Sequence, residues 1–206
     1  MIDHIGIIGA GTMGAGIMIG AVMSGVTVTL IDRDIAACAR AAKRLERYLA
    51  RQAEKGRLAP NALPAIHARL HCATDFAALG GCKLVIEAVF ENLELKRQIF
   101  AQIEANVSDT IILASNTSCL RLAEIATALR HRSRFCGMHY FSPAEINPVV
   151  ELVSGPDTAD TVIAAVQGFL RQTGKEVVSC SDQYGFALNR FFCPYTNEAV
   201  HLLDEG

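Results

Sequence analysis

Apolar and polar positions near the start of the chain follow two different patterns, separated by glycines. Residues 5–8 form a short apolar run, a glycine-rich turn follows at 9–14, and a longer apolar run continues to about residue 23. Residues 26–31 then alternate between valine or leucine and threonine before ending in isoleucine. The change from a short run to a long run and back to alternation predicts a strand, a tight turn, a helix and a second strand.

The middle of the chain continues this alternation of helical and strand patterns. Residues 34–55 contain no glycine or proline and are rich in helix formers, and residues 60–70 predict a second, shorter helix, so the two would form a helical hairpin. A short strand is expected at 71–74, and the nearly continuous apolar centre of 83–89 predicts a strand buried on both faces of a parallel sheet. A helix at 93–106, capped by Asn92 and with apolar residues at 95, 99 and 103, precedes another buried strand at 110–114.

The pattern in the last third of the chain predicts the strands that form one edge of the sheet. Two prolines separate the apolar runs 134–141 and 149–153, which favours two antiparallel strands with a tight connection. Such a pairing sets His139 opposite Glu151. A helix is expected at 158–173 and a strand at 175–180, which completes a mostly parallel, doubly wound α/β sheet with antiparallel strands at one edge.

A long helix is expected from about residue 184 to the end of the chain. Its apolar side chains include Phe191, Tyr195 and Leu202, and they need a surface that buries them. The helix therefore folds back on the α/β domain, or a partner chain or a further domain covers it.

The glycine-rich turn and the acid after the second strand predict a dinucleotide site. Gly9 permits a sharp turn, Gly11 lets a pyrophosphate approach the backbone at the helix N-terminus, and Gly14 allows the helix to pack closely on the strand. Asp32 stands where a carboxylate accepts hydrogen bonds from the ribose hydroxyls. The remaining expected cofactor contacts here are Thr12, Met13 and Arg33. An arginine can accompany a 2′-phosphate, but Asp32 would repel that phosphate, so NAD is favoured over NADP.

Composition and charge narrow the classes of protein to which the chain can belong. Residues 5–31 carry no charge, which resembles a membrane span, but the glycines and the Val-Thr alternation favour strand, helix and strand instead. The acidic start of the chain does not favour a signal peptide, and a net charge of −2 gives no bias toward nucleic acid. We expect a cytoplasmic protein, or one of an organelle matrix. The seven cysteines show no metal-ligand spacing, so we expect mostly buried, reduced thiols and no metal.

One histidine stands out as a candidate general base. His139 ends an apolar run, with Glu151 in the next one, whereas the other five histidines lie at element ends or on helical surfaces. A carboxylate bonded to an imidazole fixes its tautomer, although a buried His–Glu pair can also be purely structural. The polar turn at 115–118 follows a buried strand, and its side chains either cap the next helix or contact substrate.

Several motifs in order resemble one family. They are GAGTMGAGI with Asp32, then VIEAVFENLELK, ASNTSCL, GMHYFSP, VVELVSG and GFALNR. Together they resemble the NAD-binding domain of L-3-hydroxyacyl-CoA dehydrogenases, including the dehydrogenase part of multifunctional fatty-acid β-oxidation enzymes. The resemblance implies oxidation of a 3-hydroxyacyl-CoA thioester to the 3-ketoacyl-CoA with NAD⁺. Alternatives are a dehydrogenase of the same fold acting on a free hydroxy acid, and a dinucleotide-binding module that is inactive without a partner.

The resemblance also assigns roles by position. It implies that His139 is the base, that Glu151 is its partner, and that Ser118 and Asn189 complete the pocket around the reacting group. By the same comparison the cofactor is bordered by Glu91 and Lys96, and Lys55 meets the coenzyme A phosphates.

The resemblance further implies a domain division. Residues 1–183 would be the NAD-binding Rossmann domain, and 184–206 the first helix of an otherwise absent all-helical domain that closes over the acyl chain and makes a homodimer. The sequence departs from the family at Ser142, where asparagine is frequent, and at Tyr184, where proline is frequent.

Overall fold

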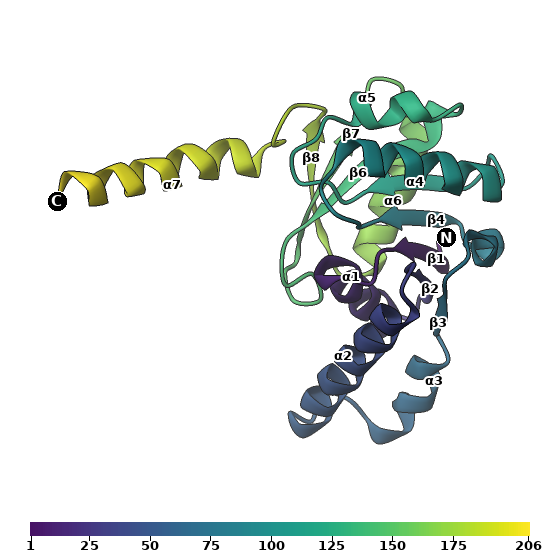
Figure 1. Cartoon of the computed structure of the whole chain (residues 1–206). Helices are drawn as coiled ribbons and strands as arrows, with labels where there is room; N and C mark the ends of the chain where they lie inside the picture. Colours follow the sequence, from purple (N-terminus) through teal and green to yellow (C-terminus); the bar gives the residue numbers. More distant parts are fainter.

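The computed structural model describes residues 1–206, the side chain of Pro60 excepted. Its centre is one eight-stranded sheet with the order β3-β2-β1-β4-β5-β6-β7-β8 (Figure 1). The strands are β1 (His4–Ile8), β2 (Thr27–Ile31), β3 (Leu70–Ala73), β4 (Leu84–Glu87), β5 (Ile112–Ser115), β6 (Phe135–Tyr140), β7 (Val149–Ser154) and β8 (Glu176–Ser181). The first six strands of the chain are mutually parallel; β7 runs antiparallel to β6, and β8 parallel to β7. The predicted mostly parallel sheet with reversed strands at one edge is confirmed.

Helices cover both faces of the sheet. One hydrophobic cluster packs α1 (Thr12–Met23), α2 (Ile35–Glu54) and α6 (Asp160–Gln172) on one face. A second cluster packs α4 (Leu93–Asn106), α5 (Leu122–Ile125) and the 3-10 helices η2 (Phe76–Gly81) and η3 (Ala126–Ala128) on the other. The strands between them are buried from both sides, which explains the nearly continuous apolar run of β4.

The helical hairpin after β2 packs on the edge of the sheet and extends beyond it as an arm (Figure 1). Asp34 caps α2 by accepting a hydrogen bond from the Ala36 N–H, and Gly56 ends it with a φ of 66°. The returning limb is shorter than expected, with η1 (Pro60–Ala62) followed by α3 (Leu63–His67). Figure 1 shows this arm projecting beyond the N-terminal half of the sheet.

Three local expectations need correction. The buried residues of α4 include Lys96, Phe100 and Ile103, while Leu95 and Ile99 are only half-buried, because the helix also turns a charged residue inward. The helix expected after residue 120 is shortened to α5 and η3, with a further 3-10 turn at η4 (Arg132–Arg134). The seven cysteines are all free, but only three of them, Cys38, Cys82 and Cys136, are buried.

The last helix, α7 (Leu188–Glu205), points away from the rest of the molecule (Figure 1). None of its residues is buried, and Phe191, Tyr195 and Leu203 expose between 68% and 81% of their surface. In the described part of the chain, no helix combines the length and the apolar character needed to cross a membrane.

Candidate functional site

The glycine-rich turn leaves β1 in a shape that only glycine permits at two positions. Gly9 has a φ of 102°, and a Cβ there would lie 2.7 Å from the Ala88 carbonyl oxygen. A Cβ on Gly14 would lie 1.8 Å from the Gly9 carbonyl oxygen, so α1 can pack against the turn only without a side chain. In front of Gly11, by contrast, a Cβ would meet nothing within 4 Å. The turn is therefore packed against the protein at Gly9 and Gly14 and open at Gly11, which leaves room for a phosphate group.

The start of α1 is free to receive an anion. Gly11 is its N-cap, with no side chain bonded to the first amides and no acid in the first turn, where Thr12 and Met13 lie. Such a helix start offers unpaired N–H groups and the positive end of the helix dipole. These features fit a dinucleotide pyrophosphate.

Asp32 joins the turn to the end of β2. Its Oδ2 accepts a hydrogen bond from the Ala10 N–H at 2.9 Å, and its Oδ1 accepts one from the Asp34 N–H at 3.0 Å. These two bonds fix the carboxylate at the C-terminal edge of the sheet, and each oxygen keeps acceptor capacity for a ribose hydroxyl. Arg33 beside it is exposed.

The same edge of the sheet holds His139 and Glu151. The antiparallel register of β6 and β7 sets the two residues directly opposite each other, as predicted. His139 Nδ1 lies 2.7 Å from Glu151 Oε2, and their side chains are 7% and 2% exposed. Because an ionised carboxylate can only accept, Nδ1 is the donor in this bond, and in the neutral imidazole Nε2 is then an acceptor.

The second oxygen of Glu151 is bonded as well. Oε1 accepts hydrogen bonds from the N–H groups of Ala187 at 3.0 Å and Leu188 at 2.7 Å, at the start of α7. The Cys180 thiol is a weaker donor at 3.7 Å, and burial together with Glu151 raises its pKa to about 11, so the thiol keeps its proton. Both carboxylate oxygens are thus held, and the first turn of α7 forms part of the site.

The polar turn after β5 contacts Glu91, in the segment between β4 and α4, and Asn189 near the start of α7. Burial would raise the pKa of Glu91, but hydrogen bonds from the Thr117 hydroxyl, Lys96 and the Ser118 N–H outweigh it and lower the pKa. Asn189 of α7 donates from Nδ2 to the Ser118 carbonyl oxygen at 2.8 Å.

The helix that this turn was expected to cap begins instead at Leu122. Its first amides, of Leu122 and Ala123, donate to the carboxylate of Asp182 at 2.6 and 2.9 Å. The capping interpretation of the polar turn is therefore wrong for α5.

Sequence reasoning missed a buried carboxylate next to this turn. Glu87, at the end of β4, is fully buried and lies 2.7 Å from the Lys96 ammonium, which is itself 1% exposed. Its other oxygen accepts from the Ser115 hydroxyl at 2.7 Å, and Lys96 also reaches Glu91 at 3.1 Å. A charged residue inside an otherwise apolar strand was the signal that could have revealed Glu87.

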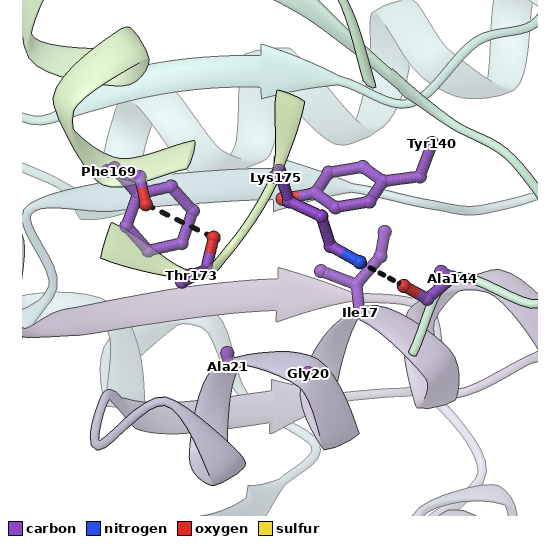
Figure 2. Close-up of a pocket in the computed structure, with 8 residues that line it drawn as sticks. All are labelled: Ile17, Gly20, Ala21, Tyr140, Ala144, Phe169, Thr173 and Lys175. Atoms are coloured by element: carbon purple, nitrogen blue, oxygen red, sulfur yellow. Dashed lines mark hydrogen bonds between the residues drawn. The ribbon is translucent and has the colours of Figure 1, made fainter. Parts of the chain in front are cut away.

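The connection between β6 and β7 is bonded to Lys175, just before β8, and to α2. Lys175 donates from Nζ to the carbonyl oxygens of Ala144 and Asn147, each at 2.7 Å, and Figure 2 shows this side chain beside the ring of Tyr140 above α1. Glu145 in the same connection binds Arg44 of α2 at 2.6 Å. The hollow in Figure 2 is largely apolar and excludes His139 and Asp32, so we assign it to packing beneath the site.

Not every predicted residue lies at this edge. Lys55 is the C-cap of α2, at the end of the arm, and the structure does not bring it to His139. Within the described residues no group of histidines, cysteines and acids could hold a metal ion. A glycine-rich turn of the dinucleotide-binding type and an imidazole bonded to a buried carboxylate nevertheless share one sheet edge, and hydride transfer to a nicotinamide needs a cofactor site and a base of this kind side by side. The fold and the site thus define a nicotinamide-dependent dehydrogenase.

Comparison with known proteins specifies the family. The family model described as "3-hydroxyacyl-CoA dehydrogenase, NAD binding domain" matches residues 4–183. The mitochondrial hydroxyacyl-coenzyme A dehydrogenase of Rattus norvegicus is 35% identical over 212 residues, which cover 100% of this chain and 68% of that protein. The fatty acid oxidation complex subunit alpha of Vibrio cholerae is 42% identical over 144 residues, covering 70% of this chain and 20% of that protein.

A solved structure agrees with these relatives. The (S)-3-hydroxybutyryl-CoA dehydrogenase of Ralstonia eutropha superposes with a TM-score of 0.97 at 36% identity, covering 100% of this chain and 73% of that chain. The chain belongs to the 3-hydroxyacyl-CoA dehydrogenase family, and its cofactor is NAD.

Proposed function

We propose that the chain oxidises (S)-3-hydroxyacyl-CoA to 3-ketoacyl-CoA with NAD⁺. The observation that carries this proposal is the 2.7 Å hydrogen bond between His139 and Glu151, buried at the edge of the sheet where the dinucleotide turn lies. The bond supports an imidazole that carries a proton on Nδ1 and turns Nε2 toward the proton of the C3 hydroxyl.

The proposed proton transfer balances the reaction. When bound, NAD⁺ supplies the acceptor for the hydride that leaves C3. His139 takes the hydroxyl proton through Nε2, and Glu151 stabilises the imidazolium that forms. In the reverse direction the imidazolium returns the proton to the ketone oxygen. Ser118 donates its hydroxyl to the substrate oxygen, and Asn189 holds the Ser118 backbone through its bond to the carbonyl oxygen.

Residues along the same edge would bind the cofactor. We assign the pyrophosphate to the turn and the start of α1, the ribose to Asp32 with Arg33 beside it, and the nicotinamide side to Glu91, Lys96 and Ser118. The turn residues are Gly9, Gly11, Thr12, Met13 and Gly14. The open space before Gly11 and the unpaired helix start support this assignment.

The arm would meet the coenzyme A phosphates through Lys55, because an exposed ammonium at a helix end suits a phosphate contact. Lys55→Met should raise the KM for acetoacetyl-CoA and leave the KM for NADH unchanged. Lys43→Met, about three turns earlier on the same helix, is the matched control. Equal effects of both substitutions would contradict the assignment. Absence of competition by free coenzyme A would favour a free hydroxy acid as substrate instead.

The central test is NADH-dependent reduction of acetoacetyl-CoA by the wild-type chain and by His139→Gln. We expect the substitution to lower kcat by about 10²–10⁴-fold, the usual contribution of general acid–base catalysis, with the Kd for NADH unchanged. Near-normal turnover of the variant would refute the role of His139. Bound NADH without wild-type turnover would favour a module that needs a partner.

Residues 1–183 would form the NAD-binding domain, and 184–206 the first helix of a helical domain through which the protein associates as a homodimer. The exposed apolar side chains of α7 support this division. We further propose the cytoplasm or an organelle matrix as the compartment, because the seven free cysteines fit a reducing environment.

A further inference from the structure

Phe186 has an unusual backbone conformation beside the proposed catalytic pair. In the described chain it is the one residue other than glycine with a positive φ, at 51°, and it follows Gly185 with a φ of 72°. The left-handed region is unfavourable for a bulky side chain, whereas glycine would adopt it without strain. Phe186 is also buried, with 4% of its surface exposed. A strained and buried aromatic residue at this place indicates that its side chain has a role in the site.

The turn at Phe186 aims the next two amides at Glu151. The N–H groups of Ala187 and Leu188, which immediately follow it, are the donors to Glu151 Oε1. The N–H of Gly185 is bonded in turn to the Cys119 carbonyl oxygen at 3.2 Å, so the segment is anchored on the polar turn after β5. The orientation of Glu151 therefore depends on how this segment reverses direction.

The ring of Phe186 acts on the other member of the pair. Its centroid lies 5.8 Å from that of the His139 ring, and the Phe141 ring lies 4.4 Å from the same imidazole. The imidazole thus has aromatic neighbours from two segments and a carboxylate on Nδ1. These contacts restrict the rotation that would move Nε2 away from the substrate.

We propose that Phe186 is a positioning residue for the dehydrogenase reaction, a proposal that rests on the function given above. Its ring packs on His139, and its backbone turn holds Glu151 through the two amides that follow. Phe186 therefore acts through both members of the pair and need not touch the substrate.

Three substitutions test whether the loss follows the ring, with the backbone strain either kept or relieved. Phe186→Gly removes the ring but tolerates the positive φ, Phe186→Ala removes the ring and keeps the strain, and Phe186→Leu keeps apolar bulk. Phe76→Ala is the matched control, because Phe76 packs against the same hydrophobic cluster in the crossover before β4. All variants are normalised to the concentration of NADH-binding sites, so that a loss of folded protein does not count as a loss of catalysis.

We expect Phe186→Gly and Phe186→Ala to lower kcat by roughly 10–100-fold, because small displacements of a catalytic group cost about that much. The KM for NADH should stay unchanged, Phe186→Leu should recover most of the loss, and Phe76→Ala should keep the wild-type kcat. The proposal is overturned if Phe186→Gly and Phe186→Ala both keep kcat within about twofold of wild type. It is also overturned if Phe76→Ala lowers kcat as much as they do.

A second measurement does not depend on turnover. The Nδ1 proton that His139 donates to Glu151 should give a far-downfield proton resonance, assigned by its loss in His139→Gln. We expect this resonance to shift or broaden in Phe186→Ala and to persist in Phe76→Ala. An unchanged resonance in Phe186→Ala overturns the proposal. A chain that shows the expected shift but turns over no acetoacetyl-CoA would contradict the proposed function, while still showing that Phe186 positions the His139–Glu151 pair.

Discussion

At the residue scale, Asp32 has a structural role in addition to its proposed role in binding the ribose. It holds the glycine-rich turn through the Ala10 N–H and the start of α2 through the Asp34 N–H, and its position suits the ribose hydroxyls. A carboxylate that accepts bonds from both the protein and a ligand makes the shape of the turn sensitive to ligand binding. The preference for NAD over NADP follows from the same charge, because a 2′-phosphate would meet an anion.

Asp32→Ala should raise the Kd for NADH by about 10–100-fold, since hydrogen bonds to a charged group contribute roughly 1.5–3 kcal/mol. Isothermal titration with NADH measures the change. In a parallel titration, the Kd for NADPH should fall relative to the Kd for NADH. Asp34→Ala is the control. It removes the cap of α2, so its cost should appear in the free energy of unfolding rather than in the Kd for NADH. An Asp32→Ala chain that binds NADH as tightly as wild type would disprove the ribose assignment.

At the element scale, α4 carries two charged residues that its helical pattern did not predict to be buried. Lys96 is enclosed between Glu87 of β4 and the half-exposed Glu91, and Glu104, near the other end of the helix, is also buried. Removing one member of a buried ion pair leaves an uncompensated charge, which is more costly than the pair is favourable. α4 is therefore fixed at both ends by charges as well as by its apolar residues.

Lys96→Met should lower the free energy of unfolding by about 3–5 kcal/mol, because Glu87 would remain buried without its cation. Urea denaturation followed by circular dichroism measures the loss. The double variant Glu87→Gln with Lys96→Met should lose less, since the amide can still bond to the Ser115 hydroxyl and no fully buried charge remains unpaired. A loss below about 1 kcal/mol in the single variant would show that the buried pair is not a stability determinant.

Glu104 predicts how stability depends on pH. Burial would raise the pKa of its carboxyl, but the backbone N–H groups of Arg130 and His131 and the Arg134 guanidinium outweigh it and hold the pKa below the ordinary 4.5. Because the folded pKa is lowered, its stabilising contribution is complete above pH 4.5 and is lost as the pH falls through the folded pKa. In Glu104→Gln, the free energy of unfolding, measured by urea denaturation at a series of pH values, should fall less steeply at acidic pH. An equally steep fall in the variant would show that other carboxyl groups cause the loss of stability at acidic pH.

Periodic patterns in the sequence predicted the individual helices and strands. They did not predict contacts between segments that are far apart in the sequence. The pairing of His139 with Glu151 could be predicted because two prolines mark a tight connection, and register then fixes the opposite residues. The bonds from the start of α7 to Glu151 could not, because they join residues 36 and 37 apart through a turn with no periodicity. Lys96 was predicted near the cofactor only through family resemblance; its burial needed the neighbouring carboxylates, which no helical period reveals.

At the scale of the whole molecule, α7 is the feature that the α/β domain leaves unpacked. Its first turn is bonded to the site, but the rest of the helix extends away from the sheet with large apolar side chains in solvent (Figure 1). Apolar surface of this kind is uncommon on a monomer and marks a contact region. A helix bonded at one end to Glu151 also links whatever packs on α7 to the proposed catalytic pair.

The 206-residue chain should therefore associate through α7 as its concentration rises, measured as mass by light scattering. Replacing Phe191, Tyr195 and Leu202 together by serine should shift the chain toward monomer, because each lost apolar side chain removes part of the surface that association would bury. Replacing Asn197, His201 and Asp204 by serine, at helical spacing on the opposite side of α7, is the matched control and should leave the mass unchanged. A chain that stays monomeric at every concentration, with identical masses for both triple variants, would show that α7 does not drive self-association.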